Sequence, residues 1–210
     1  MNAREDILKR IRKGLQTAEF KKIEPVHLPN TEIYHTPDKP LHEIFADELM
    51  KINGEYHFCK SKEEITGKLR ELNETKGLSL CYLPDKNLSG YVENTGIEYT
   101  QEFKDEKKIK SGISGCEFLV ARFGSVMVSS ALPGSRRIFS FPEIHIVIAE
   151  QNQIVLELEE ALDGMMKRYD GNLPSQITNI TGPSRTADIE KTLILGAHGP
   201  KQLIVLLLNQ

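Results

Sequence analysis

The sequence predicts an α/β fold in which a mostly parallel sheet is flanked by helices, and three observations support this. Amphipathic helical segments alternate with short apolar segments through the first half of the chain, as in sheets built from crossover units. Near-continuous apolar runs at residues 144–149 and 203–208 are typical of strands buried on both faces. With 39% hydrophobic and 27% charged residues, the 210-residue chain has the composition of a globular domain.

The first 40 residues are predicted to form an appendage to a single α/β domain at residues 41–210. A helix is expected at residues 4–15, where Ile7, Ile11 and Leu15 share one face and basic side chains occupy the rest. This helix is expected either to dock with its basic face in solvent or to serve as a partner-binding arm. Residues 25–40 hold four prolines, at positions 25, 29, 37 and 40, which favours an extended linker.

Alternating elements are expected in the first half of the domain. The spacing of apolar residues predicts helices at residues 41–52 and from Ser61 onward, and strands at residues 56–59 and 78–83. Ser61 with Glu64 three residues later predicts a capping box at the start of the second helix.

The second half is expected to contain more strands and one helix. Residues 116–121 and 125–129 flank Arg122-Phe123-Gly124 closely enough to form a hairpin. A helix is expected near residues 158–165, and short strands at residues 144–149 and 176–180. The run at residues 203–208 is expected to be either an interior strand or the edge of a homodimer. Residues 112–115 are interpreted as a turn-like fragment.

Composition narrows the classes of function. A net charge of −3 provides no basic field for nucleic acid. Cys59, Cys81 and Cys116 are scattered, which favours buried thiols in a reducing compartment over a disulfide framework or a cysteine-ligated cluster. No apolar run is long enough to cross a bilayer, and residues 1–16 lack the apolar core of a signal peptide. A cytoplasmic location is therefore expected.

The richest chemistry lies at residues 181–190 and 196–200, between the strand at residues 176–180 and the last strand. Ligands in open α/β sheets gather past the carboxyl ends of strands, so a ligand site is expected here. Gly182 would admit close backbone approach, and Ser184, Arg185 and Thr186 would hold a carboxylate or phosphate. The acid–base candidates are Asp188, Glu190 and His198. The alternative is that these residues only form turns and helix caps.

A second cluster combines a cationic pair with a histidine. Arg136 and Arg137 are candidate anion ligands in a loop, and His145 is a candidate catalytic residue two positions from the carboxylate of Glu143. The alternative for His145 is a core histidine with satisfied hydrogen bonds. No metal site is predicted, because the remaining linker-region histidines match no zinc pattern: His27, His35 and His42.

Several segments resemble the LutC-type lactate-utilisation proteins of the LUD domain family. The resemblance is carried by ITGPSRTADIEKTLILGAHGPKQLIVLLL at residues 180–208, PEIHIVIAE at residues 142–150, GISGCEFLVARFGSVMVSS at residues 112–130 and REDILKRIRKGL near the N-terminus. It implies a fold similar to the NagB/RpiA/CoA-transferase group and a role in bacterial oxidation of L-lactate to pyruvate. It also implies iron–sulfur partner proteins that carry the clusters, with no cofactor in this chain and a small anionic 2-hydroxy acid as substrate.

The sequence departs from the family pattern at one turn, and two functions other than lactate oxidation are also considered. Family members often carry acidic and hydroxyl residues before the hairpin glycine, where this chain has Arg122 and Phe123, and that change favours a different substrate if the turn faces the ligand. One rival is a stand-alone sugar-phosphate isomerase, cyclo-ligase or acyl-CoA transferase; the last would need Glu117, Glu143 or Glu190 as nucleophile. The other rival is a non-catalytic scaffold for the redox subunits.

Overall fold

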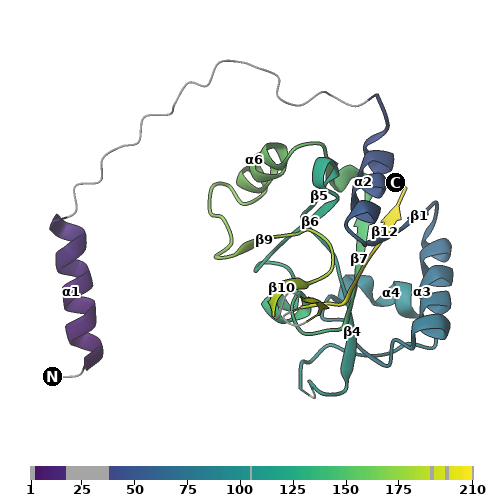
Figure 1. Cartoon of the computed structure of the whole chain (residues 1–210), viewed down its shortest axis with the longest axis horizontal. Helices are drawn as coiled ribbons and strands as arrows, with labels where there is room; N and C mark the ends of the chain where they lie inside the picture. The colour runs from purple at the N-terminus through teal and green to yellow at the C-terminus, as the bar shows by residue number, and fades with distance from the viewer. Residues whose placement is uncertain (1–2, 18–37, 105, 190–191, 197–198, 210) are drawn as a thin grey trace. The chain divides into compact units, whose positions relative to one another are not determined.

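The computed structural model describes residues 3–17, 38–104, 106–189, 192–196 and 199–209. The chain divides into two compact units, Met1–Thr36 and Pro37–Gln210. The described part of the first unit is the helix α1 (Ala3–Thr17), as predicted (Figure 1). Its apolar stripe is not covered, since Ile7, Ile11 and Leu15 are 58%, 51% and 59% exposed.

A six-stranded parallel sheet forms the centre of the second unit, which confirms the predicted fold class. Its two most apolar strands, β7 and β12, lie inside the sheet, so their side chains are buried on both faces. The C-terminal apolar run is therefore an interior strand. In spatial order the strands are β1 (Glu55–Cys59), β12 (Gln202–Leu208), β7 (Ile144–Glu150), β4 (Ile109–Ser114), β2 (Leu80–Tyr82) and β3 (Glu98–Thr100).

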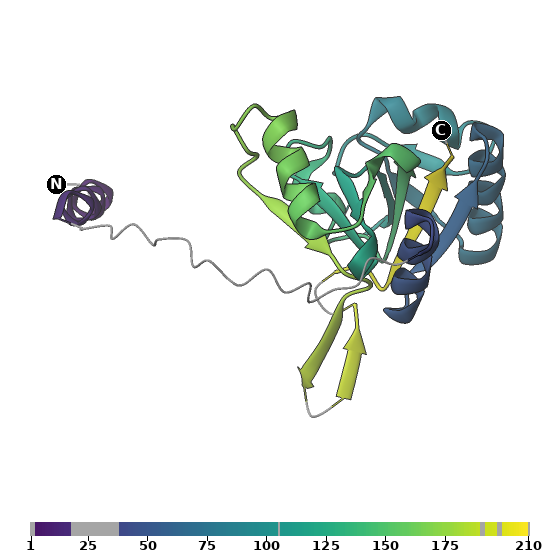
Figure 2. The ribbon, with the colours of Figure 1, turned by 90° about the horizontal axis from the view of Figure 1, so that it is seen from above.

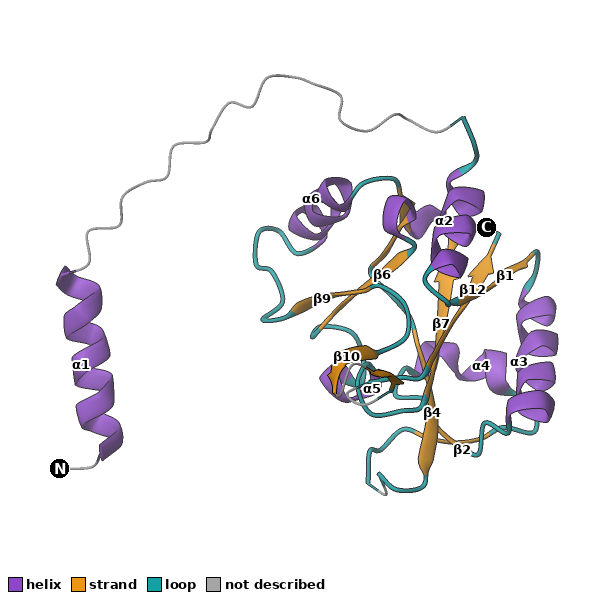
Figure 3. Ribbon diagram, viewed as in Figure 1, coloured by secondary structure: helices purple, strands orange, loops and turns teal. Residues whose placement is uncertain are grey.

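Different layers cover the two faces of this sheet (Figures 1 and 3). Along β7, Ile146 packs into the core that includes the helix α3 (Lys62–Lys76) and the short helix α4 (Ser89–Val92). Val147 faces the opposite core, with the helix α2 (Leu41–Lys51) and a second sheet. The short helix α5 (Ser135–Ile138) also packs on this side, through Ile138.

The second sheet has four strands, and its central pair is the predicted hairpin. Its outer surface packs on the helix α6 (Leu158–Arg168) through Phe118, Met127 and Met165. In order the strands are β8 (Ile154–Val155), β5 (Phe118–Val120), β6 (Ser125–Ser129) and β9 (Ile177–Ile180). Single 3-10 turns at Lys86–Leu88 (η1), Ala121–Phe123 (η2) and Gln151–Gln153 (η3) connect the elements.

The interpretation of residues 112–115 as a turn fragment is wrong. Residues up to Ser114 belong to β4, which lies between β7 and β2. The apolar pattern did not predict this strand because it contains a glycine at a tightly packed position. A Cβ at Gly112 would lie 2.9 Å from Pro142 Cγ and 3.1 Å from Ile138 Cγ1. The polar Ser111 is accommodated because its hydroxyl donates to the Leu78 carbonyl at 2.6 Å.

The capping box at α3 is only half correct. The Ser61 hydroxyl accepts from the Glu64 backbone N–H at 3.4 Å, as expected. The Glu64 carboxylate, however, accepts from the backbone N–H of Lys60 at 2.7 Å and not from that of Ser61.

A separate two-stranded ribbon connects the second sheet to β12. Its strands β10 (Arg185–Ile189) and β11 (Thr192–Leu195) are antiparallel, with Arg185 opposite Leu195. Figure 2 shows the ribbon extending away from the body of the second unit. No sequence pattern predicted it. None of the helices in the described ranges has the length and apolar character needed to span a membrane.

Candidate functional site

The candidate site begins at the base of this ribbon, where two segments of the predicted cluster meet. The backbone N–H of Ser184 donates to the Pro200 carbonyl at 2.8 Å, and the N–H of Gly196 donates to the Ser184 carbonyl at 2.9 Å. A Cβ at Gly199 would lie 3.2 Å from Ser184 Cβ. We call this contact region, made by Ser184, Gly196, Gly199 and Pro200, the ribbon junction. Glu190 and His198 lie outside the described residues.

Gly182 and Arg185 attach the ribbon junction to the end of α2. Gly182 has φ +82°, and a Cβ there would lie 2.8 Å from the Ile52 carbonyl oxygen. A side chain would be strained at this position, which explains the glycine. The Arg185 guanidinium donates to the same Ile52 carbonyl. Thr186 and Asp188 follow in β10, and their backbone positions place them along the ribbon.

The ribbon junction does not lie past the carboxyl end of a strand of the parallel sheet, where a ligand site was expected. Residues 181–184 do follow a strand, but β9 belongs to the second sheet and pairs antiparallel with β6. Ser184 contacts Pro200, which lies just before the amino end of β12 in the parallel sheet. The rule about carboxyl ends of parallel strands therefore does not apply here.

His145 lies in the core between the sheets, fully buried. The Ser114 hydroxyl donates to the Gly115 carbonyl at 2.9 Å, so its oxygen can accept from Nε2–H of His145, which lies 2.8 Å away. Nδ1 has no hydrogen-bond partner. Glu143 precedes the strand and forms an ion pair with Lys201 at 3.3 Å. The position matches a core histidine, with one nitrogen unsatisfied.

Burial lowers the pKa of His145 from 6.5 to about 4, so the folded protein holds it neutral. The unfolded chain takes up a proton below pH 6.5, and stability is therefore lost as pH falls from 6.5 toward 4. The shift corresponds to about 3 kcal/mol. We expect His145→Gln to lose less stability between pH 7 and pH 4.5 than the wild type, measured by urea unfolding. Equal pH dependence in the two proteins would contradict the prediction.

Arg136 and Arg137 lie on the helix α5, not in a loop, and both are exposed. Arg136 donates to the Ser175 hydroxyl at 3.3 Å. Ser175 precedes β9, whereas Gly182 follows it. The structure therefore brings the arginine pair to the opposite end of β9 from Gly182, and the two predicted clusters are distinct.

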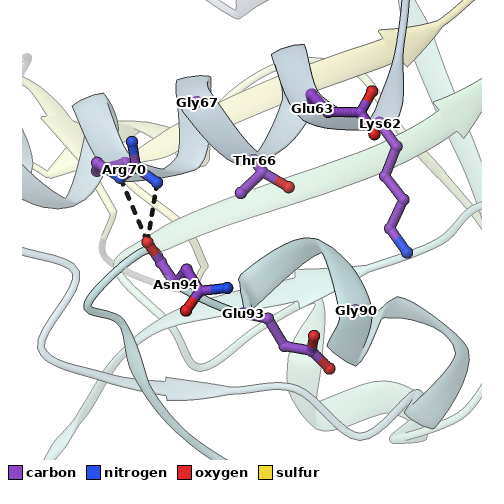
Figure 4. Close-up of a pocket in the computed structure, with 8 residues that line it drawn as sticks. All are labelled: Lys62, Glu63, Thr66, Gly67, Arg70, Gly90, Glu93 and Asn94. Carbon is purple, nitrogen blue, oxygen red and sulfur yellow. Dashed lines mark hydrogen bonds between the residues drawn. The ribbon is translucent and has the colours of Figure 1, made fainter.

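A groove that the sequence did not predict separates α3 from α4 (Figure 4). Its volume is about 500 Å³. Both of its cations already have partners in the protein: Arg70 donates twice to the Asn94 carbonyl, at 3.0 and 3.3 Å, and the Lys62 amine lies 5.2 Å from the centre of the Tyr91 ring. The lining residues are Lys62, Glu63, Thr66, Gly67, Arg70, Gly90, Glu93 and Asn94.

Glu117 is the most completely hydrogen-bonded carboxylate of the described residues, and it is 1% exposed. It accepts hydrogen bonds from Ser129 Oγ, Tyr169 OH and Arg168 Nη1, each at 2.6 Å. Burial and this carboxylate raise the pKa of Tyr169. With both oxygens occupied, Glu117 is not presented as a nucleophile for acyl transfer. In the sequence, the only indication of this buried carboxylate is that Glu117 lies within an apolar segment.

The unusual hairpin turn packs against the protein itself. Arg122 Nε donates to Glu157 Oε1 at 2.6 Å, and Gly124 approaches the backbone of α2 at Leu49. The side chain that departs from the family pattern thus forms an ion pair within the domain. The described ranges contain no group of three or more potential metal ligands. Burial raises the pKa of the Cys81 thiol to about 12.

Comparison with known proteins finds the LUD domain and several proteins named lactate utilization protein C. The model of the LUD domain matches residues 42–208. An uncharacterized Neisseria meningitidis protein is 31% identical over 65% of this chain and 64% of its own length, and lactate utilization protein C of Bacillus subtilis is 31% identical over 52% and 46%. Thus the chain spans only about half to two thirds of those two relatives. Lactate utilization protein C of Exiguobacterium is 29% identical over 98% of this chain and 96% of its own length.

A crystal structure with a similar fold comes from Deinococcus radiodurans. This DUF162 family protein superimposes with a TM-score of 0.60 over 80% of this chain and 96% of its own, at 15% identity. At that identity the likeness concerns the fold alone.

Proposed function

This chain belongs to the LUD domain family, and from that premise we propose that it is a component of a bacterial system that oxidises L-lactate to pyruvate. The observation that carries the proposal is the near full-length similarity to a lactate utilization protein C. The LUD match also covers nearly all of the second unit, including the ribbon junction.

We propose the ribbon junction as the place where the substrate carboxylate binds. Arg185 is exposed and uses a guanidinium N–H on the Ile52 carbonyl, which leaves other donors for a carboxylate. Ser184, Gly182 and Thr186 would complete the anion site. Asp188, Glu190 and His198 follow along the same segment and are the proposed proton-transfer groups.

Oxidation of a 2-hydroxy acid to a 2-oxo acid releases a pair of electrons and a pair of protons, which need an acceptor. The three cysteines of this chain are buried. We propose that iron–sulfur partner proteins take the electrons. We assign docking on such a partner to α1, whose exposed apolar stripe and basic side chains are suited to an acidic groove.

Reconstitution with iron–sulfur proteins of a lactate-utilisation system would test the proposal. We expect lactate-dependent pyruvate formation only when the full chain is added. A chain lacking residues 1–17 should fail to co-purify with the partners. Undiminished pyruvate formation without this chain would refute the proposal. Thermal stabilisation by phosphosugars, but not by hydroxy acids, would support a stand-alone enzyme instead.

A further inference from the structure

A second cluster of side chains lies away from the ribbon junction and has no role in the proposed lactate chemistry. We call it the arginine–aromatic cluster; it consists of Tyr82, Phe103, Arg137 and Phe141. The rings of Tyr82 and Phe103 lie 5.0 Å apart, and those of Phe103 and Phe141 lie 5.4 Å apart, both edge to face. The Arg137 guanidinium lies 5.3 Å from the centre of the Phe103 ring.

The cluster occupies a favourable position in the sheet. Tyr82 is the last residue of β2 and pairs with Thr100, the last residue of β3. Phe103 lies three residues after the end of β3, so two parallel strands end near this cluster. This is the place where open α/β sheets usually bind ligands, and the ribbon junction does not occupy it.

Neighbouring contacts hold the cluster in place before any ligand binds. Gly134, immediately before α5, has φ +82°, and a Cβ there would lie 2.2 Å from Pro84 Cγ and 3.2 Å from Tyr82 OH. The start of α5 is therefore fixed against the end of β2. Arg136 donates to the Ser175 hydroxyl at 3.3 Å and is not counted in the cluster. Arg137 packs on the Phe103 ring, and a donor held in this way lowers the cost of ordering on binding.

The charges and the exposed ring indicate what the cluster would bind. In the part of the chain that the structure describes, neither Arg136 nor Arg137 forms an ion pair, although acidic residues outnumber basic ones by 30 to 27. Phe141 is 55% exposed, which is unusual for a large aromatic ring. Guanidinium groups bind phosphates through paired hydrogen bonds, and exposed aromatic rings stack on planar bases.

We propose that the arginine–aromatic cluster binds a nucleotide. The planar base stacks on Phe141, and the phosphate binds Arg137. The site is separate from the ribbon junction, so the proposal does not depend on the lactate function.

Calorimetry with the full chain tests this. AMP and FMN are the probes; adenosine lacks the phosphate, and ribose 5-phosphate lacks the base. We expect at least one nucleotide to bind, and both truncated probes to bind at least tenfold more weakly than it. Arg137→Gln should weaken nucleotide binding about tenfold, the value of a charged hydrogen bond. Phe141→Ala should weaken it by a similar factor through lost stacking.

Two substitutions outside the cluster serve as matched controls. Arg10→Gln removes an exposed arginine of α1, and Phe123→Ala removes an aromatic ring that is 40% exposed. Both should bind the nucleotide as the wild type does. The proposal is overturned if neither nucleotide binds, if ribose 5-phosphate binds as tightly as the nucleotides, or if the control substitutions weaken binding as much as the cluster substitutions.

Discussion

Replacing Glu117 by alanine is expected to lower the free energy of unfolding by about 3–5 kcal/mol. The substitution leaves Tyr169 OH and Ser129 Oγ without their acceptor, and Arg168 without its carboxylate. Arg168 also lies 4.8 Å from the centre of the Phe118 ring, so its position on the second sheet depends on this cluster. In a chain of this size the loss corresponds to a fall in Tm of roughly 6–20 °C.

Glu71→Ala provides the control for this prediction. Glu71 also forms an ion pair, with Lys68 on α3, but its side chain is 59% exposed. An exposed pair of this kind contributes about 0.5 kcal/mol or less. Chemical unfolding of both variants separates the effects, and a similar loss in the two would show that the burial of Glu117 is energetically unimportant.

Gly124→Ala should also be severely destabilising, by about 4 kcal/mol or more. Gly124 has φ +57°, and a Cβ would lie 2.2 Å from the Leu49 backbone nitrogen and 2.6 Å from Leu49 Cα. Because these atoms belong to the backbone of α2, no side-chain rotation relieves the clash. Either α2 or the β5–β6 turn must move.

Gly171→Ala isolates the conformational part of this cost. Gly171 has φ +77°, but nothing lies within 4 Å of an added Cβ. Its loss should be limited to the strain of the left-handed conformation, about 1–2 kcal/mol. Urea unfolding of the two variants measures the difference, and equal losses would argue against the close approach of the turn to α2.

Much of the fold could be predicted because strands that are buried on both faces have apolar sequences. β7 and β12 are apolar at nearly every position because both of their faces are covered. β4 and β3 do not have such sequences. β4 uses glycine and serine where Pro142 and the Leu78 carbonyl occupy the space, and β3 is an edge strand with exposed Glu98 and Tyr99.

The site was harder to predict because its position depends on pairing between distant segments. The sequence indicated that residues 181–200 belong together, and the Ser184–Pro200 hydrogen bond joins their two halves. β9 belongs to the second sheet because it pairs with β6, some fifty residues earlier in the chain. No local sequence pattern predicts that pairing. Arg137 of α5 was identified, but the Phe103 ring on which it packs comes from the loop after β3.

The strand order has a consequence for how the protein is made. Among the described strands β1 pairs with β12 alone, so the residues it needs emerge from the ribosome about 150 positions later. At translation rates of roughly 5–20 residues per second, β1 waits on the order of ten seconds or more for its neighbour. During that interval its hydrogen-bonding edge is open to chaperones and to other nascent chains, and the parallel sheet closes only after β12 has been synthesised.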